Sequence, residues 1–424
     1  MSKRLHRLAN GMLVLCDPAP GLETIAVSLV VRGGARWEPQ GRCGWSHLLE
    51  HMVFKGAGER SAQEIVETVE AAGAQINAAT SHERTSFQVR SLKDRLPLAL
   101  EVLSDLTLRP TFRPDELERE VEVIGQEIAE AFDTPDDHVF EMAQAEAFSG
   151  QPLGRPILGE VASIAVADGK TLEDWRARLY APERMCLSVA GAVDEAELLR
   201  LAESWFGGER SRSSTSVTPE PAPGVFRGGH ARLSRRIEQA NLVWQLPAPA
   251  ASAPERYAAR LFVEILGGGM ASRLFQQARE QRGLAYTIDA WITSYEDCGV
   301  LGVFAGAAAD KAVDLGRLVA EQIRALADDV TEAELGRAKA QFQTALFMGE
   351  ESLMSRAERN ASQTFLFGAP LPAQAVRQTL EAVSREDLKQ VAQSLLAHRR
   401  SATAVLGPRA AHGAGRAFEQ AIFN

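Results

Sequence analysis

The pattern of apolar and polar positions repeats in the two halves of the chain. Each half begins with a short continuous apolar stretch, which is typical of a buried strand. It continues through three segments with apolar residues at helical spacing and ends with a helix-like stretch followed by an apolar strand. These stretches are residues 25–31, 62–72, 96–108, 116–131, 172–179 and 186–192 in the first half, and 241–246, 254–266, 311–327, 332–346, 385–396 and 401–406 in the second. The repetition predicts an α+β fold of two homologous α/β-sandwich domains, each a mixed or antiparallel sheet flanked by helices, related by internal duplication.

A change of composition marks the middle of the chain. Residues 207–229 read GGERSRSSTSVTPEPAPGVFRGG and are rich in Ser, Pro, Gly and Arg. Such a segment is typical of an exposed linker. We therefore predict an N-terminal domain over residues 1–210, a linker over 211–230 and a C-terminal domain over 231–424.

Composition excludes several classes of function. The chain has 424 residues and a net charge of -10, which argues against a nucleic-acid partner, because that partner favours a basic surface. An acidic cavity would instead favour basic peptides. Four scattered cysteines without a CxxC spacing (Cys16, Cys43, Cys186 and Cys298) indicate a reducing compartment. The N-terminus lacks a sustained apolar region and no apolar run has the length of a membrane span, so we expect a cytoplasmic protein without a membrane partner.

The segment His47-Leu48-Leu49-Glu50-His51 carries the clearest chemical signal. On a helix, His47 and His51 are four residues apart and Glu50 is three from His47, so the three side chains share one face. This order, HxxEH, is the inverted form of the common zinc-protease motif, with two zinc ligands and a general base. The flanking residues are apolar, and His and Glu in such surroundings need a partner. The pattern therefore predicts a metal site.

Catalytic zinc usually takes three protein ligands and leaves one position open, so His47 and His51 need a third. The acidic helix-like segment 116–128 offers several glutamates, among which Glu120 and Glu127 are two helical turns apart and share a face. Glu127 could bind the metal while Glu120 hydrogen-bonds a ligand histidine. Spacing alone does not choose among the glutamates of this segment.

Together these residues resemble the M16 family of zinc metallopeptidases, which includes pitrilysin, insulin-degrading enzyme and the mitochondrial processing peptidase. The chain looks most like the branch with short subunits, over nearly its whole length. The first matching block is residues 33–38 with 44–56. The family places its third ligand at a distance that matches Glu127, which is 127 − 51 = 76 residues after His51, and a companion glutamate that matches Glu120.

Two further blocks match the family. The segment 75–80 resembles its substrate-binding edge strand, where Asn77 and Ala78 match positions beside the scissile bond; there a peptide binds as an added strand. The segment 266–286 carries Arg279 and Tyr286, seven residues apart like the family's Arg/Tyr pair. The resemblance implies that Arg279 holds the substrate backbone and that Tyr286 donates a hydrogen bond to the oxyanion.

The resemblance implies a zinc endopeptidase with one Zn²⁺ per subunit, held by His47, His51 and Glu127. Zinc would activate a water molecule, and Glu50 would take its proton and later deliver it to the leaving amine. Large single-chain relatives close four such domains as a clamshell, of which this chain supplies half. We therefore expect a homodimer in which the second domain of one subunit completes the zinc site of the other, forming a chamber that admits unfolded peptides.

Two other interpretations remain open. The chain could be one subunit of a heterodimer with a related M16 chain that processes a specific precursor peptide, for example in quinone-cofactor biosynthesis. It could also be a non-catalytic scaffold like the respiratory-complex core proteins of the same superfamily. The presence of both the zinc motif and the Arg/Tyr pair in one chain favours the homodimeric peptidase.

Overall fold

The computed structural model describes residues 3–208 and 220–424, and the chain forms two compact units. Unit 1 combines Met1–Ala129, Pro156–Pro221 and Met348–Leu371, and unit 2 combines Glu130–Arg155, Ala222–Phe347 and Pro372–Asn424, each over its described residues. Of the expected linker 211–230, residues 211–219 lie outside the described residues, and the next strand begins at Gly229. The two units therefore do not simply follow the two halves of the sequence, because each includes a segment from the other half.

Unit 1 is built on a six-stranded sheet with the order β1-β2-β6-β3-β5-β4. Its strands are β1 (Arg4–Arg7), β2 (Leu13–Pro18), β3 (Thr24–Val31), β4 (Gln75–Thr80), β5 (Thr85–Leu92) and β6 (Met185–Gly191). The pair β2 and β6 is parallel and the other neighbours are antiparallel. Strands β3 and β6 are buried along almost their whole length, as expected for central strands that are covered on both faces.

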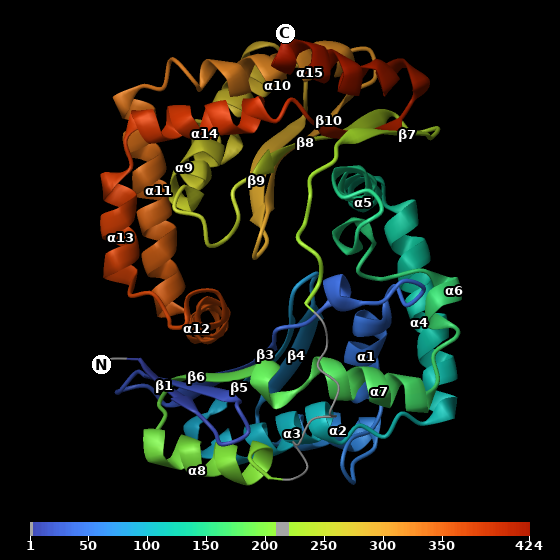
Figure 1. Cartoon of the computed structure of the whole chain (residues 1–424), viewed down its shortest axis with the longest axis vertical. Helices are drawn as coiled ribbons and strands as arrows, with labels where there is room; N and C mark the ends of the chain where they lie inside the picture. The colour runs from blue at the N-terminus through green and yellow to red at the C-terminus, as the bar shows by residue number, and fades with distance from the viewer. Residues whose placement is uncertain (1–2, 209–219) are drawn as a thin grey trace. The chain divides into compact units, whose positions relative to one another are not determined.

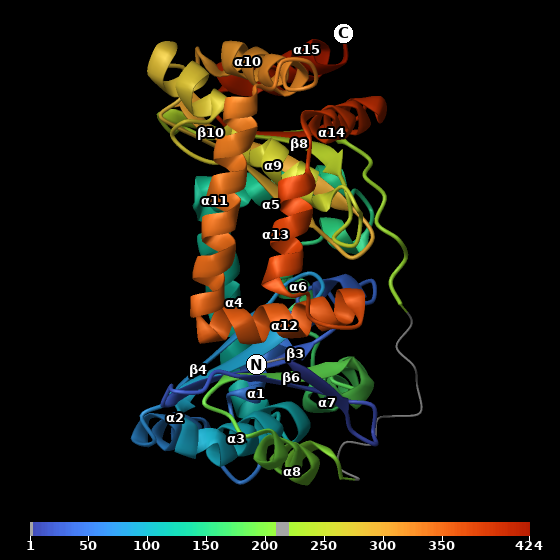
Figure 2. The same ribbon diagram turned by 90° about the vertical axis from the view of Figure 1, so that its left-hand side faces the viewer.

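Helices cover both faces of this sheet (Figures 1 and 2). The face with the larger core carries η1 (Ala35–Trp37), α1 (Trp45–Val53), α2 (Ala62–Ala71), η2 (Lys93–Arg95), α3 (Leu96–Leu108), the first part of α4 (Pro114–Asp133), α6 (Val161–Ile164), α7 (Gly169–Leu179), η4 (Pro182–Arg184) and α8 (Glu195–Phe206). The other face is covered by α12 (Leu353–Phe367). There Met354 and Ala357 pack on Ala26 and Ala190 of the sheet.

A buried polar contact also anchors α12 to unit 1. Asp17, which is almost fully buried at the end of β2, accepts hydrogen bonds from Arg356 Nε at 3.0 Å and from Asn360 Nδ2 at 2.8 Å. A buried carboxylate is tolerated only when it is paired and hydrogen-bonded. Polar contacts as well as apolar packing therefore determine where α12 docks.

Unit 2 has a five-stranded sheet with the order β7-β11-β8-β10-β9. Its strands are β7 (Gly229–Ser234), β8 (Gln239–Ala248), β9 (Thr287–Ser294), β10 (Gly299–Ala308) and β11 (Ala402–Gly407). Its helices are α5 (Pro135–Ala147), η3 (Pro152–Gly154), α9 (Arg256–Gly267), the π-helix η6 (Phe275–Gln281), α10 (Ala312–Ala325), most of α11 (Glu332–Glu351), α13 (Ala373–Ala382), α14 (Arg385–Ala397), η7 (Arg409–Gly413) and α15 (Ala414–Phe423). Helix α5 packs on one face, where Phe140 contacts Trp291 and Phe304, while α10 and α15 lie on the opposite face (Figure 1).

The two sheets share one topology, which confirms the predicted duplication. The series β2-β6-β3-β5-β4 in unit 1 corresponds to β7-β11-β8-β10-β9 in unit 2, and in both the first pair is parallel and the rest are antiparallel. Both sheets are mixed and flanked by helices, as the α+β prediction requires. Among the residues that the structure describes, there is no helix with both the length and the apolar character of a membrane span.

Candidate metal centre

Helix α1, which carries the HxxEH motif, is fixed at its N-terminus by Glu38. The Glu38 carboxylate accepts hydrogen bonds from the backbone N–H groups of Gly44 at 2.9 Å and Ser46 at 2.7 Å. These N–H groups have no partner within the helix, and a negative charge is favourable at this end. Gly44 itself has a φ of 90°, a left-handed conformation that favours glycine. The chain is therefore held in one geometry at Gly44, three residues before His47.

A buried ion pair supports this turn from the side. Arg36 and Glu83 are both almost fully buried, and Arg36 Nη1 lies 2.6 Å from Glu83 Oε1. A side chain at Gly34 would collide with the backbone oxygen of Ser81, so the close approach of these segments needs glycine. The block at residues 33–38, which the sequence matched to a family motif, thus serves to position α1. Sequence reasoning did not identify Glu38 as a residue that orients the motif.

Three side chains of unit 1 converge in a geometry that suits a metal ion. His47 Nε2 and His51 Nε2 are 3.2 Å apart, and Glu127 Oε2 on α4 lies 3.9 Å from the first and 3.8 Å from the second. Two nitrogen ligands at about 2.0–2.1 Å from a tetrahedral zinc lie roughly 3.3 Å apart. Within the described part of the chain, this is the one group of His, Cys, Asp or Glu with such geometry. The set of two histidines and one glutamate is one that zinc uses in catalytic sites.

His47 also has the neutral protonation state that a metal ligand needs. Burial, followed by the neighbouring His51, lowers the pKa of His47 to about 4. The imidazole is therefore neutral at pH 7 and offers a lone pair. Its Nδ1 atom is buried and has no hydrogen-bond partner among the described residues, while Nε2 is the ring nitrogen that faces the other two ligands.

His51 is oriented by Glu120, which is only 3% exposed. Glu120 Oε1 lies 2.7 Å from His51 Nδ1, and Glu120 Oε2 accepts from Lys55 Nζ at 2.7 Å. Burial lowers the pKa of His51, but the hydrogen bond to Glu120 and the charges of nearby carboxylates outweigh it, so the pKa is raised overall. A carboxylate on the far nitrogen fixes the tautomer and turns Nε2 toward the metal position. Lys55 was missed as a functional residue, although it lies in the matched block 44–56.

Replacing Glu120 with Gln should weaken zinc binding by about 10–100-fold, because an amide orients His51 less firmly and contributes no charge. Zinc affinity is to be measured by competition with a chromophoric chelator. Replacing Glu118 with Gln is the matched control, since Glu118 is exposed on the same helix. Equal affinity in the two variants would remove Glu120 from the metal centre.

Glu50 lies on the same face of α1 with one carboxylate oxygen buried. Its Oε2 has no hydrogen-bond partner among the described residues. Burial raises the pKa of Glu50, and hydrogen bonds from Thr80 oppose this in part. A carboxyl whose pKa lies nearer neutrality is better suited to accept and release a proton. Thr80, at the end of β4, is a second contact that sequence reasoning did not identify.

A cavity of about 720 Å³ runs from the metal-binding residues along β4. Glu50, His51 and Glu120 line one end, and Gln75, Asn77 and Ala78 of β4 line its side. Strand β4 is the last strand of the sheet, and it pairs with β5 on one edge only. A free edge with unpaired N–H and C=O groups is a template for a further strand. Asn77 and Ala78, which the resemblance matched to the substrate strand, therefore lie on a free sheet edge and line the same cavity as Glu50.

Arg279 and Tyr286 belong to unit 2 and lie together there. The guanidinium carbon of Arg279 is 5.4 Å from the centre of the Tyr286 ring and 4.8 Å from that of Phe275. Arg279 lies on the π-helix η6, a rare helix type that is frequent at functional sites. Tyr286 is 72% exposed, which is unusual for a large aromatic residue. The structure thus brings the predicted metal ligands together in unit 1 and the Arg/Tyr pair together in unit 2.

Comparison with solved structures shows the same fold. A protease from Helicobacter pylori matches with a TM-score of 0.89 and 21% identity, over 96% of this chain and 99% of that one. A structure described as a peptidase M16 inactive domain from Pseudomonas fluorescens matches with a TM-score of 0.86 and 19% identity, over 96% of this chain and 98% of that one. At these identities the likeness concerns the fold.

Sequence comparisons show the family. The profile described as insulinase (peptidase family M16) matches residues 13–161, and the profile of the peptidase M16 inactive domain matches residues 168–342. A protein of Rickettsia bellii named an uncharacterized zinc protease is 33% identical over 95% of this chain and 97% of its own length. The uncharacterized zinc protease YmxG of Bacillus subtilis is 32% identical over 93% of this chain and 96% of its own length. With similarity of this extent over both units, the chain belongs to peptidase family M16.

Proposed function

We propose that this protein is a zinc-dependent endopeptidase that cleaves peptides or unfolded segments. The observation that carries the proposal is the convergence of His47, His51 and Glu127 near the partly buried carboxylate of Glu50, at the end of a cavity that follows a free sheet edge. The names of its relatives, which are called zinc proteases, support the choice of metal and of reaction class.

In this proposal the three ligands hold one zinc ion per chain, since the described residues form one such group. Zinc, when bound, supplies a Lewis acid that activates water and polarises the scissile carbonyl. Glu50 accepts the proton of the attacking water and delivers it to the leaving amine. Glu120 acts through His51 and is a positioning residue. The partial burial of Glu50 keeps its pKa raised.

The substrate is proposed to bind as an additional strand on β4. Backbone hydrogen bonds to the free edge give affinity with little demand on sequence, while the cavity accepts side chains. The strand β4 alternates exposed and half-buried residues, with Ile76 and Ala78 packed on the core of unit 1. A peptide on this edge is placed next to Asn77 and Ala78, close to Glu50. Only an extended segment fits this mode, so folded proteins are poor substrates.

A mixed-peptide digest tests this function. Incubation of a defined peptide library with the protein should give internal cleavage products by mass spectrometry, and a chelator should abolish them. Stoichiometric zinc should restore cleavage, because the ligand set binds one ion per chain. Removal of residues only from the ends of the peptides, with no internal cut, would contradict endopeptidase activity. Cleavage that continues in the presence of the chelator would contradict the role of the metal.

We further propose that the peptide site is completed by Arg279 and Tyr286 of a second copy of the chain in a homodimer. The exposure of Tyr286 and its contact with Arg279 support this, because the two side chains lie together yet are exposed within their own unit. In that dimer Arg279 holds the substrate backbone, and Tyr286 donates a hydrogen bond to the developing oxyanion. Loss of one such donor typically costs about 10²–10³-fold in rate.

Mixing two inactive variants tests the shared site. A Glu50→Gln subunit and an Arg279→Ala subunit, each inactive alone, form one intact site in the mixed dimer if the site is shared between subunits. Random exchange then restores about a quarter of wild-type activity, since about half of the dimers are mixed and each has one of two sites intact. No recovery, with exchange verified by differently tagged subunits, would place the Arg/Tyr pair in another role.

A further inference from the structure

Glu70 is an acidic residue in the cavity beside the metal centre whose charge has no partner. It lies in the last turn of α2 and lines the cavity of about 720 Å³ that follows β4. No ion pair or side-chain hydrogen bond of Glu70 occurs among the residues that the structure describes. By contrast, Glu67 on the same helix lies outside the cavity and accepts a hydrogen bond from Gln63 at 2.6 Å. The carboxylate of Glu70 can therefore bind a ligand in the cavity.

The position of Glu70 on α2 is unfavourable for a negative charge. The last turn of a helix is near the negative end of its dipole, and this turn contains no basic residue. Glu67 lies three residues earlier on the same helix face and adds repulsion between like charges. A cationic group in the cavity would relieve both effects.

The other carboxylates around the metal position can be balanced without a ligand. Glu120 contacts Lys55 and His51, at 2.7 Å in each case. Together, Glu50, Glu120 and Glu127 carry three negative charges, which Lys55 and one divalent ion would neutralise. Among the described residues that line the cavity, Glu70 then has the charge that remains uncompensated.

Apolar side chains lie next to Glu70 in this cavity. Val66 is one helical turn before Glu70 on α2, so the two side chains are neighbours. Val66 is 47% exposed, which leaves apolar surface beside the carboxylate. The further apolar residues that line the cavity are Phe54, Val69, Ala74 and Ile76. Lysine and arginine have a matching structure, because an apolar stem carries a cationic end.

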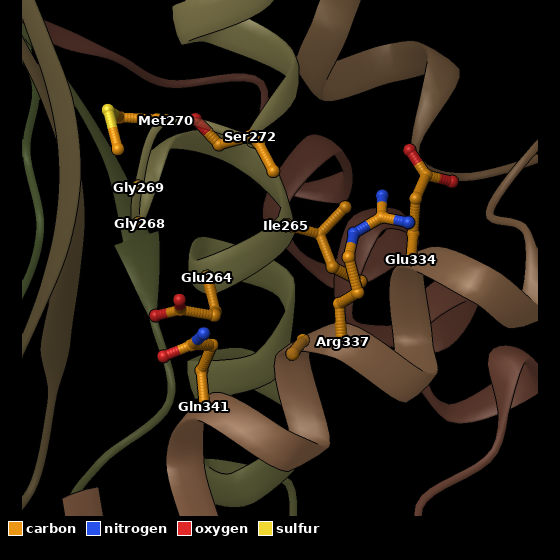
Figure 3. Close-up of a pocket in the computed structure, with 11 residues that line it drawn as sticks. Glu264, Ile265, Gly268, Gly269, Met270, Ser272, Glu334, Arg337 and Gln341 are labelled. Atoms are coloured by element: carbon orange, nitrogen blue, oxygen red, sulfur yellow. The ribbon is translucent and has the colours of Figure 1, made fainter. Parts of the chain in front are cut away.

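The cavity of unit 2 does not gather its charged groups in this way (Figure 3). It has a volume of about 320 Å³ and lies between α9, the glycine-rich turn after it, and α11. The guanidinium of Arg337 turns toward Glu334 and away from Glu264. The charged groups of this cavity therefore do not converge on one ligand.

The inference for Glu70 rests on the proposed function, in which a peptide lies along β4. Successive side chains of a strand point to opposite faces, so every second side chain of the peptide points to the same side as Ile76 and Ala78. We propose that the cavity selects a lysine or arginine side chain of the bound peptide, with its stem on Val66 and its charged end at Glu70. The bond that is cleaved then lies at a fixed distance from a basic residue.

Binding of matched peptides to the full-length Glu50→Gln protein tests this proposal without cleavage. One labelled peptide carries a single arginine among neutral residues, and the other carries citrulline, which keeps the stem and has no charge. Fluorescence anisotropy should show about two- to fivefold tighter binding of the arginine peptide, the size expected for an exposed ion pair. Equal affinities would overturn the proposal.

Variants of Glu70 on the same background show whether this carboxylate is responsible. In Glu70→Gln the preference for arginine should disappear, and in Glu70→Lys the citrulline peptide should bind more tightly. Glu67→Gln is the matched control, because Glu67 is exposed on the same helix, and it should keep the preference. Damage to the fold would weaken both peptides alike and leave their ratio unchanged. A preference that survives both changes of Glu70 would overturn the assignment.

Cleavage by the wild-type protein gives a second test. Moving the arginine by one residue along the host peptide should move the cleaved bond by one residue, as read by mass spectrometry. Cleavage that does not follow the arginine would overturn the inference and leave the proposed peptidase function intact. Absence of all cleavage would count against the peptidase function, and the binding preference would still decide the role of Glu70.

Discussion

Replacing Glu50 with Gln should abolish peptide cleavage while zinc stays bound. The amide keeps the size of the side chain but cannot accept the proton of the attacking water, and general acid–base groups contribute about 10²–10⁴-fold to the rate. Glu50 is not part of the metal-binding triangle of His47, His51 and Glu127, so zinc content should stay near that of the wild-type protein. Cleavage of a fluorogenic peptide and metal analysis on the same sample measure both quantities.

The matched control for this variant is Glu67→Gln, because Glu67 is exposed on α2. It should cleave like the wild-type protein. Wild-type rates in Glu50→Gln would show that another group acts as the base. Loss of zinc from Glu50→Gln would show instead that Glu50 is a ligand, which would reassign the metal centre.

Replacing Glu127 with Ala should remove both zinc and activity. Only two histidines then remain as ligands. The loss of zinc affinity should exceed the roughly 10–100-fold that follows from removing a group that hydrogen-bonds a ligand. The fold should be preserved, since Glu127 is partly exposed and no hydrogen bond from it to another described residue holds α4 in place. Zinc stoichiometry after dialysis and thermal unfolding of the metal-free protein test these two expectations.

Glu118→Ala serves as the control on the same helix, because Glu118 is exposed and, two residues from Glu120, lies on the opposite face of α4. It should keep one zinc per chain and full activity. Full zinc occupancy in Glu127→Ala would contradict the assignment of the third ligand. A fall in unfolding temperature of the metal-free variant, relative to the metal-free parent, would indicate that Glu127 has a structural role as well.

The acidic segment of α4 shows where sequence reasoning stopped. Helical periodicity placed Glu120 and Glu127 on one face, but every other glutamate in the segment was also a candidate ligand. In the structure, Glu116 forms an ion pair with Arg119. Glu118 and Glu122 are exposed to solvent. Glu120 is buried against His51, and Glu127 reaches the two Nε2 atoms. The choice depends on how α4 is rotated against α1, which is a property of packing.

The helices α5 and α12 show the same limit for the fold. An amphipathic pattern tells which face of a helix is apolar, but not which sheet that face will cover. Helix α5 precedes the linker and packs on the sheet of unit 2, while α12 follows it and packs on the sheet of unit 1. The prediction of a single domain boundary at the linker missed this exchange of helices between the two units. The contacts that hold each helix on its sheet join residues more than 150 positions apart.

Spacing along the chain was enough to predict the duplicated α+β organisation, the HxxEH helix face and the pair of candidate glutamates on α4. Each of these depends on spacing along one chain segment, where the geometry of a helix or strand is fixed locally. The packing of distant segments was needed to show that Glu38 caps α1, that Lys55 holds Glu120, and that α5 and α12 each cover the sheet of the other half. The same holds for the cavity between α9 and α11. These features join segments far apart in sequence, and such contacts depend on burial and shape, which periodicity does not encode.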